Sequence, residues 1–468
     1  MIPGSDTRPP FVSFAGAAIA LGLAVILSWP MLAVTAPMGY FDSFSYYQTG
    51  QAAIEMIRGV LFPPEAGGGG GGGGGGPAPT DGIRNLRSFS YAVFLFVTAQ
   101  TPLKMVLSCW IQTAMTFLVL FAFIDPGDRF RMAWVAAGGA GILAVTTLPW
   151  FASYAMPDIF SAAILLYGAV LMRRLDLLGV WQVLVLIAIA ALAVISHYGH
   201  QPLAVAVFGL ALLWRLVQRR LSLLSVVAAV VPIAAAMSIN LVASAVVLDS
   251  PSITPKRMPI LLARSIEDGP ARWYLNDNCA TKKYAICEIF DEIPADLGEI
   301  LWRPTGLKSA TSEQMDRIRA EEREILREAF LTYPGQQTWS LMQNFFIQLK
   351  EVGTGEILPL MLSPGDPGWA EMKIETSDAD RFPVLEIYDS VVIYGTLAGV
   401  AGLAVLWLQG RFDREERELL LICLAGICIN AAIFGGLSEP ADRYQSRLIW
   451  LLPVLCLFIA SRRRTGAS

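Results

Sequence analysis

Long apolar runs separated by short polar segments dominate the pattern along this chain. A helix needs about 20 apolar residues to cross the ~30 Å hydrocarbon layer of a bilayer. Ten runs approach that length, and they cover residues 11–34, 102–124, 133–149, 158–172, 179–196, 201–217, 222–248, 389–409, 419–436 and 446–461. The pattern predicts an all-α polytopic membrane protein with about 10 transmembrane helices.

A long polar segment between the seventh and eighth runs predicts a soluble domain at 249–388, which leaves transmembrane regions at 1–248 and 389–468. Within it, apolar residues recur at helical spacing over 311–331, after a Thr311–Gln314 pair typical of a capping box. A second helix is expected over 336–350. The segment therefore reads as a mainly helical domain, α or α+β.

A second long segment, the loop 35–101, contains ten consecutive glycines from Gly67 to Gly76. Glycine loses the most backbone entropy on ordering, so this tract predicts a linker without fixed structure. A phosphate-cradling role would need a strand and a helix around the glycines, and the sequence predicts neither. The flanking residues 43–61 and 84–100 carry aromatic and apolar side chains at helical spacing, which predicts helices lying on the membrane surface.

Composition supports the membrane prediction. Hydrophobic residues make up 54% of the chain and charged residues only 16%, against about a quarter in soluble proteins. A soluble multidomain enzyme, a disordered chain and a small disulfide-stapled domain are thereby excluded. The net charge of −4 shows no basic bias, so no nucleic-acid partner is expected; the expected environment is a lipid bilayer.

Arginines separate cleanly between alternate loops, which predicts the topology. With the N-terminus inside, the inner loops and span ends hold Arg8, Arg129, Arg131, Arg173, Arg174, Arg215, Arg219, Arg220, Arg411, Arg414, Arg417, Arg462, Arg463 and Arg464. The outer loops 150–157 and 197–200 hold no Lys or Arg, and 437–445 holds only Arg443. We expect a multi-pass protein of a bacterial inner membrane with both termini inside and 249–388 in the periplasm.

Cys279 and Cys287 lie in this predicted external domain, whereas the other four cysteines lie in predicted spans. Because an external compartment permits disulfides, we expect these two to pair. The alternative is two free thiols. A metal site is not favoured, because no histidine lies nearby in the sequence.

Unusual polar residues gather at the predicted outer face: Asp42, Lys104, Asp158, His197, His200, Asp442, Arg443, Tyr444 and Arg447. Structural alternatives stay open for them. The carboxylates of Asp42 and Asp158 could cap helices, Asp442 could pair with an arginine of its own loop, and the two arginines could reach lipid headgroups. The histidines could be ordinary interfacial residues, and two of them alone make a poor metal site.

The combination predicts chemistry on a lipid-linked phosphate, with no metal or other cofactor. Arginine binds phosphate oxygens through paired donors, and a carboxylate can take the proton of an attacking hydroxyl. Asp42 is the predicted general base, with Asp158 as a secondary candidate. Predicted phosphate- or substrate-binding residues are Arg87, Lys104, His197, His200, Arg443, Tyr444 and Arg447.

This arrangement resembles the GT-C superfamily of integral-membrane glycosyltransferases, which use polyprenyl-phosphate sugars or related donors. Asp42 matches the acid of the family's first external loop, and Arg87-Ser88-Phe89-Ser90-Tyr91 is similar to the arginine and aromatic stretch before its second span. Asp442-Arg443-Tyr444 with Arg447 resembles the late Arg-Tyr motif. The resemblance implies transfer of a sugar from a polyprenyl-phosphate donor to an unknown acceptor on the periplasmic face.

Two features depart from that family. Ser43 follows Asp42 where many members carry a second acid, which favours a metal-independent enzyme. The soluble domain also lies between the seventh and eighth spans, whereas in many members it follows the last. The alternatives are a lipid-linked oligosaccharide ligase or polymerase, a transporter or flippase of envelope glycolipids, and a non-enzymatic assembly subunit.

Overall fold

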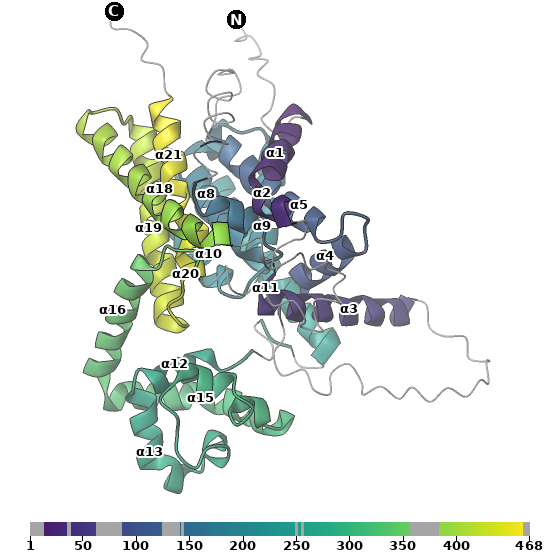
Figure 1. The fold of residues 1–468 in the computed structure, drawn as a ribbon, viewed down its shortest axis with the longest axis vertical. Coiled ribbons are helices and arrows are strands. Elements are labelled where there is room, and N and C mark those ends of the chain that lie inside the picture. The colour runs from purple at the N-terminus through teal and green to yellow at the C-terminus, as the bar shows by residue number, and fades with distance from the viewer. Residues whose placement is uncertain are drawn as a thin grey trace, which may run out of the picture.

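A computed structural model describes residues 14–34, 39–61, 87–123, 141, 145–248, 251–253, 257–355 and 383–461 (Figure 1). Every regular element within these ranges is a helix, which confirms the all-α prediction for the described part of the chain. The tract Gly67–Gly76, most of the run 133–149, and Arg8, Arg129, Arg131 and Arg462–Arg464 lie outside the described residues.

The N-terminal apolar region begins with two consecutive helices and continues through the elements α1 Phe14–Leu27, α2 Trp29–Val34, α3 Phe41–Leu61, α4 Phe89–Ala99, α5 Val106–Phe121, α7 Leu148–Ala152, η1 Pro157–Ile159, α8 Phe160–Ala169, η2 Val170–Arg174, η3 Leu175–Leu177, α9 Val180–Ile195, α10 His200–Val217 and α11 Leu223–Leu248. The C-terminal region contains α18 Pro383–Leu408, α19 Arg414–Leu437, α20 Asp442–Ile449 and α21 Leu451–Ala460. One continuous hydrophobic core joins the two regions.

Among the described residues, five helical segments are long and apolar enough to cross a bilayer: His200–Val217, Leu223–Val246, Tyr388–Leu408, Arg414–Leu437 and Asp442–Ala460. Several other predicted spans are shorter or divided. The first run breaks between α1 and α2 near Ser28, and α8 is a ten-residue helix buried along its whole length. The structure supports a membrane protein, and the count of about 10 spans stays a prediction.

Helices α3 and α4 lie side by side at one end of this bundle. Figure 1 shows α3 running across the lower end of the apolar body, crosswise to α18 and α19. Gly50 permits the close packing, because a Cβ at this position would lie 2.1 Å from the Ala92 carbonyl oxygen. This arrangement fits the surface helices that the sequence predicts on both sides of the glycine tract.

Residues 257–350 include a part with a hydrophobic core of its own, and we call this segment the external domain after its predicted side of the membrane. The elements around this core are α12 Ile260–Glu267, α13 Pro270–Lys282, η4 Ala285–Glu288, α14 Leu297–Leu301, η5 Leu307–Ser309 and α15 Ser312–Thr332. The last helix, α16 Pro334–Lys350, packs mainly against α19 of the apolar region. Thr311 and Gln314 form the predicted capping box at the start of α15. Cys279 and Cys287 form a disulfide between α13 and η4.

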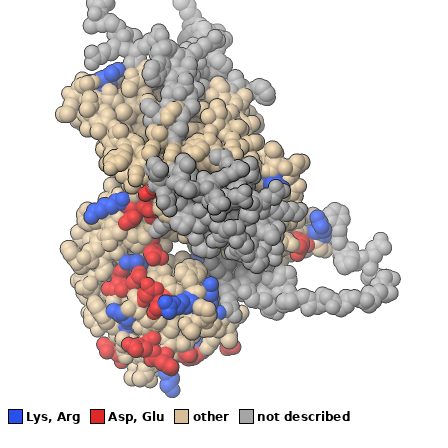
Figure 2. Space-filling model, in the orientation of Figure 1, with Lys and Arg blue, Asp and Glu red and all other residues tan. Residues whose placement is uncertain are grey.

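The two parts differ in surface chemistry. On the face drawn in Figure 2, charged side chains gather over the lower, external domain, while the described surface of the upper helices is mostly uncharged. In Figure 1, α1 begins and α21 ends at the upper end of the bundle, opposite this domain. The arrangement is compatible with termini on one side and the domain on the other; sidedness stays a prediction.

Candidate functional site

A cluster of charged and aromatic side chains lies where the bundle meets the external domain. Its members come from elements far apart in sequence: α3, the residue pair before α4, η1, α10, α19 and α20. Helix α20 packs against α16, α19, η1 and α8, which makes it the centre of this junction. The local folding of α20 therefore decides where the late Arg-Tyr residues point.

Asp42 lies in the first turn of α3, where the positive end of the helix dipole favours a carboxylate. Its carboxylate forms an ion pair with Arg87 and lies 3.5 Å from Nη2 of Arg443. The side chain retains 14% exposure. The hydroxyl of Ser43, not Asp42, accepts the backbone N–H of Tyr40 at this helix start, at 3.0 Å. Asp42 thus contacts arginines and not the helix end.

Arg443 is held between two aromatic rings. Its guanidinium carbon lies 4.3 Å from the ring centre of Tyr40 and 4.7 Å from that of Tyr444, whose hydroxyl accepts a hydrogen bond from Nη2 at 3.1 Å. Only 6% of the side chain is exposed. Cation–π contact stabilises a guanidinium that has left water, and it also fixes the orientation of the group.

Arg447, one helical turn further, is fully buried. Its Nη1 donates to Asp158 at 3.0 Å, and the two side chains are 0% and 3% exposed. Its Nη2 donates to Asn430 at 2.9 Å, and its guanidinium carbon lies 4.1 Å from the Phe434 ring centre. A buried charge requires such a partner, because leaving water is costly.

Two structural alternatives raised for this pair are therefore wrong. Asp158 lies within η1, and neither η1 nor α8 is capped by a side chain, so its carboxylate serves Arg447 and not a helix end. Arg447 does not reach toward lipid headgroups, since it has no exposed surface. The remaining carboxylate oxygen of Asp158, Oδ2, has no hydrogen-bond partner among the described residues.

The two histidines lie side by side, with ring centres 5.2 Å apart. His200 Nδ1–H donates to the Ala193 carbonyl at 2.7 Å, and its Nε2 accepts the Ser161 hydroxyl at 2.8 Å. Both ring nitrogens are therefore occupied within the bundle. His197 Nδ1 accepts the Gly199 N–H at 3.0 Å, and its ring lies 6.1 Å from Phe434, next to the arginines.

Lys104 lies apart from this cluster. Helices α3 and α4 run in the same direction, since Asp42 pairs with Arg87 at their starts and Tyr47 packs on Phe96 further along. Lys104 follows the far end of α4, a helix of 11 residues that spans about 16 Å. The structure therefore brings together every predicted site residue of the membrane region except this lysine.

Several buried donors in the cluster have no hydrogen-bond partner among the described residues. These atoms are Arg87 Nε, Arg443 Nη1, Arg447 Nε and the Tyr154 hydroxyl. The Tyr154 ring lies 6.3 Å from Tyr40, beside Arg443. Unsatisfied buried donors are costly, and three arginines against Asp42 and Asp158 leave one positive charge in excess. The arrangement has the charge and the free donors to hold an anion.

Sequence reasoning missed Asn430 and Tyr154. Asn430 Oδ1 accepts from Arg447, and its Nδ2 donates to the Tyr444 carbonyl at 2.7 Å and to Gln445 at 3.0 Å. A lone amide within the apolar run 419–436 was the available signal, since polar residues at membrane depth are usually functional or paired. Tyr154 lies in a short loop and carried no such signal.

The external domain reaches the cluster through the end of α16. The Gly353 N–H donates to Asp442 at 3.0 Å, and the Ser446 hydroxyl donates to the Gly353 carbonyl at 2.6 Å. Asp442 thus holds this loop, and among the described residues it forms no ion pair with an arginine of its own segment. Burial raises the pKa of Glu351, and the adjacent Asp442 carboxyl raises it further. The domain and the arginine helix are therefore mechanically connected.

Within the described ranges, no group of three or more His, Cys, Asp or Glu side chains is placed to hold a metal ion. Comparison with protein-family models, with curated proteins and with solved structures gave no match to this chain.

Proposed function

We propose that this protein is a membrane glycosyltransferase of the GT-C type, which transfers a sugar from a polyprenyl-phosphate donor to an acceptor at the periplasmic face. The observation that carries the proposal is the pairing of Asp42 with both Arg87 and Arg443. A carboxylate and guanidinium groups with free donors meet at one end of an apolar bundle. Transfer from a lipid-linked phosphate needs a proton acceptor and cationic donors near the membrane surface, and the proposal puts this end of the bundle there.

In the proposed reaction, an acceptor hydroxyl oxygen attacks the anomeric carbon of the donor sugar. The bond between that carbon and the phosphate oxygen breaks, and the polyprenyl phosphate leaves with the bonding electrons. Asp42 takes the hydroxyl proton. Arg443 and Arg87 stabilise the departing phosphate, since preorganised donors lower the energy of developing charge. Binding of the phosphate to these arginines would release a carboxylate oxygen of Asp42 for the acceptor.

Arg447 and Asp158 have a different part in this proposal. Arg447 is occupied by Asp158 and Asn430, so it holds α20 in place and orients Arg443 and Tyr444. His200 supports the bundle through Ser161 and Ala193. Lys104, at the far end of α4, has no role in phosphate binding.

The proposal places residues 249–388 outside, in the periplasm of a bacterium. A cysteine introduced as Ser312→Cys, at the exposed start of α15, should react with a membrane-impermeant maleimide in intact spheroplasts. Labelling only after lysis would reverse the topology and remove the site from the donor's side.

Asp42→Asn tests the chemistry itself. The amide keeps the shape of the side chain but cannot take a proton, so transfer from undecaprenyl-phosphate monosaccharides should fall by about 10²–10⁴-fold. Glu55→Gln is the matched control, because Glu55 is an exposed acid on the same helix that pairs only with Gln51 among the described residues. Unchanged transfer by folded Asp42→Asn protein would refute the general-base role.

A further inference from the structure

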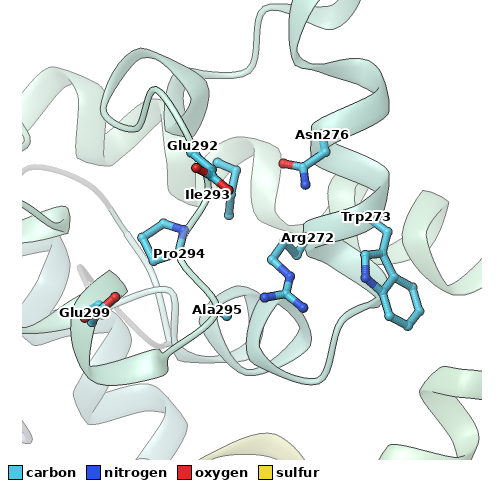
Figure 3. Close-up of a pocket in the computed structure, with 8 residues that line it drawn as sticks. All are labelled: Arg272, Trp273, Asn276, Glu292, Ile293, Pro294, Ala295 and Glu299. Atoms are coloured by element: carbon cyan, nitrogen blue, oxygen red, sulfur yellow. The ribbon is translucent and has the colours of Figure 1, made fainter.

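The external domain contains an open hollow of about 510 Å³ beside α13 (Figure 3). Its lining comes from α13, from the chain that returns opposite it and from α14: Arg272, Trp273, Asn276, Glu292, Ile293, Pro294, Ala295 and Glu299. Figure 3 shows the polar ends of Arg272 and Asn276 directed into the space between α13 and residues 292–295, with Trp273 at one edge. We propose that this hollow binds a saccharide chain, and that the chain is the glycan acceptor.

Local structure holds the Trp273 indole at the edge of the hollow. Gly269, with φ of 110°, precedes α13, and a Cβ there would lie 2.6 Å from the indole. The Tyr333 ring contacts the indole edge-on, with ring centres 5.3 Å apart. The indole is thus packed on two sides and still 37% exposed. A fixed, partly exposed aromatic ring is a ready surface for stacking.

The opposite wall is fixed by the core of the domain. The Cys279–Cys287 disulfide ties the end of α13 to η4, from which the chain leads into residues 292–295. Ile293 within this wall is buried in the hydrophobic core. Both walls are therefore preorganised, which lowers the ordering cost of binding.

The polar groups of the hollow are available to a ligand. Among the described residues, Arg272, Asn276 and Glu292 make no side-chain hydrogen bond and no ion pair. The Glu299 carboxylate forms an ion pair with Arg303, with Nη2 3.1 Å from Oε1. A guanidinium, an amide and carboxylates present donors and acceptors in pairs, as adjacent hydroxyls of a sugar require.

The chemistry of the lining selects the ligand class. An apolar ligand would contact Trp273 and the apolar residues 293–295, but it would leave the polar groups of Arg272, Asn276 and Glu292 without partners, which disfavours it. An anionic ligand would face two carboxylates and one guanidinium. A neutral saccharide combines a C–H face for the indole with a rim of hydroxyls for Arg272, Asn276 and Glu292, and so fits the whole lining. The assignment of that saccharide as acceptor rests on the proposed function; saccharide binding does not.

Binding is measured by saturation-transfer NMR and by calorimetry on the full-length protein in nanodiscs. The probes are neutral oligomers of mannose, N-acetylglucosamine and arabinose. At least one probe should bind, and Trp273→Ala should weaken its binding by about tenfold, because the indole is the largest ring available for stacking. Asn276→Ala should weaken it as well. This second variant removes an exposed side chain without a hydrogen-bond partner in the described structure, so folding is not at risk.

Trp339→Ala is the matched control, because Trp339 is a 56% exposed tryptophan of the same domain on α16, outside the hollow. It should bind the probe normally. Two results would overturn the saccharide site. One is failure of every probe to bind, and the other is binding by both Trp273→Ala and Asn276→Ala as tight as by the unaltered protein. Binding of undecaprenyl phosphate, measured separately, should be unchanged in both hollow variants; its loss in Arg443 variants alone keeps the two proposals distinguishable.

Discussion

Two arginine–carboxylate pairs in this protein have similar geometry and opposite surroundings. Arg447 and Asp158 lie 3.0 Å apart in the bundle with 0% and 3% exposure, whereas Arg317 and Glu288 lie 2.8 Å apart on the external domain with 43% and 42% exposure. The buried pair must stay intact, because either charge alone would be stranded away from water. Water can replace either partner of the exposed pair, so only the buried pair constrains the architecture.

The same contrast extends to the two regions as wholes. In the membrane region, the site consists of charged side chains whose burial costs free energy. Asn430 and the rings of Tyr40, Tyr444 and Phe434 orient these side chains. The external domain relies on a small hydrophobic core and a disulfide and leaves most of its charges in water, although Asp268 and Glu322 are buried in ion pairs with Arg264 and Arg257. Stability and site geometry are therefore coupled in the first region and largely separate in the second.

The largest expected effect comes from breaking the buried pair. Asp158→Ala leaves Arg447 unpaired, so the free energy of unfolding in detergent should fall by about 3–5 kcal/mol. The double variant Asp158→Leu/Arg447→Met should recover much of that loss, because no charge remains stranded. Denaturation followed by tryptophan fluorescence measures both. A fully stable Asp158→Ala protein would contradict the importance of this pair.

Removing the disulfide tests the external domain at its own weak point. Cys279 and Cys287 close a short loop, so Cys279→Ser/Cys287→Ser should destabilise the domain by about 2–3 kcal/mol in the chain-entropy model. Protease accessibility of the domain, followed against temperature, measures the change. Since the bundle has a separate core, binding of undecaprenyl phosphate should persist. Loss of both domain stability and undecaprenyl phosphate binding would mean that the two regions are not separable.

A smaller effect is expected where the site meets its ligand. Arg443→Gln should weaken undecaprenyl phosphate binding by about 1.5–3 kcal/mol, the contribution of a charge-assisted hydrogen bond. Lys104→Gln is the control, because this lysine lies at the far end of α4 and should not matter. Native mass spectrometry of lipid retention reports both. Equal loss in the two variants would place the phosphate elsewhere.

The smallest effect belongs to the exposed pair. Hydrogen bonding from Arg317 lowers the pKa of Glu288 below its usual value of 4.5. The unfolded chain then binds this proton more readily, so the contribution of Glu288 to stability exists above about pH 4.5 and disappears as the pH falls through the lowered value. Arg317→Gln should leave the melting temperature at neutral pH unchanged within error from that of the unaltered protein. It should slightly reduce the loss of stability as the pH falls. A large drop at neutral pH would remove the contrast with Arg447.

The sequence by itself determined the features that depend on neighbouring residues. Apolar runs predicted an all-helical chain, and helical spacing after Thr311 and Gln314 predicted α15 and its capping box. Cys279 and Cys287 were predicted to pair from their predicted external setting, and they do. These features are local, since a helix and its cap are decided within a few turns of chain.

Only the tertiary structure decided which polar groups meet. Asp158 and Arg447 are 289 positions apart, and Asn430 joins them from a third helix. By sequence position, Lys104 was as good a candidate for the outer face as Arg87. In the structure it lies apart from the cluster, because Arg87 precedes α4 and Lys104 follows its other end. Span-end residues share a face of the membrane in any packing of the helices. Which of them meet depends on how the helices pack, and the energy of pairing buried charges is absent from the sequence pattern.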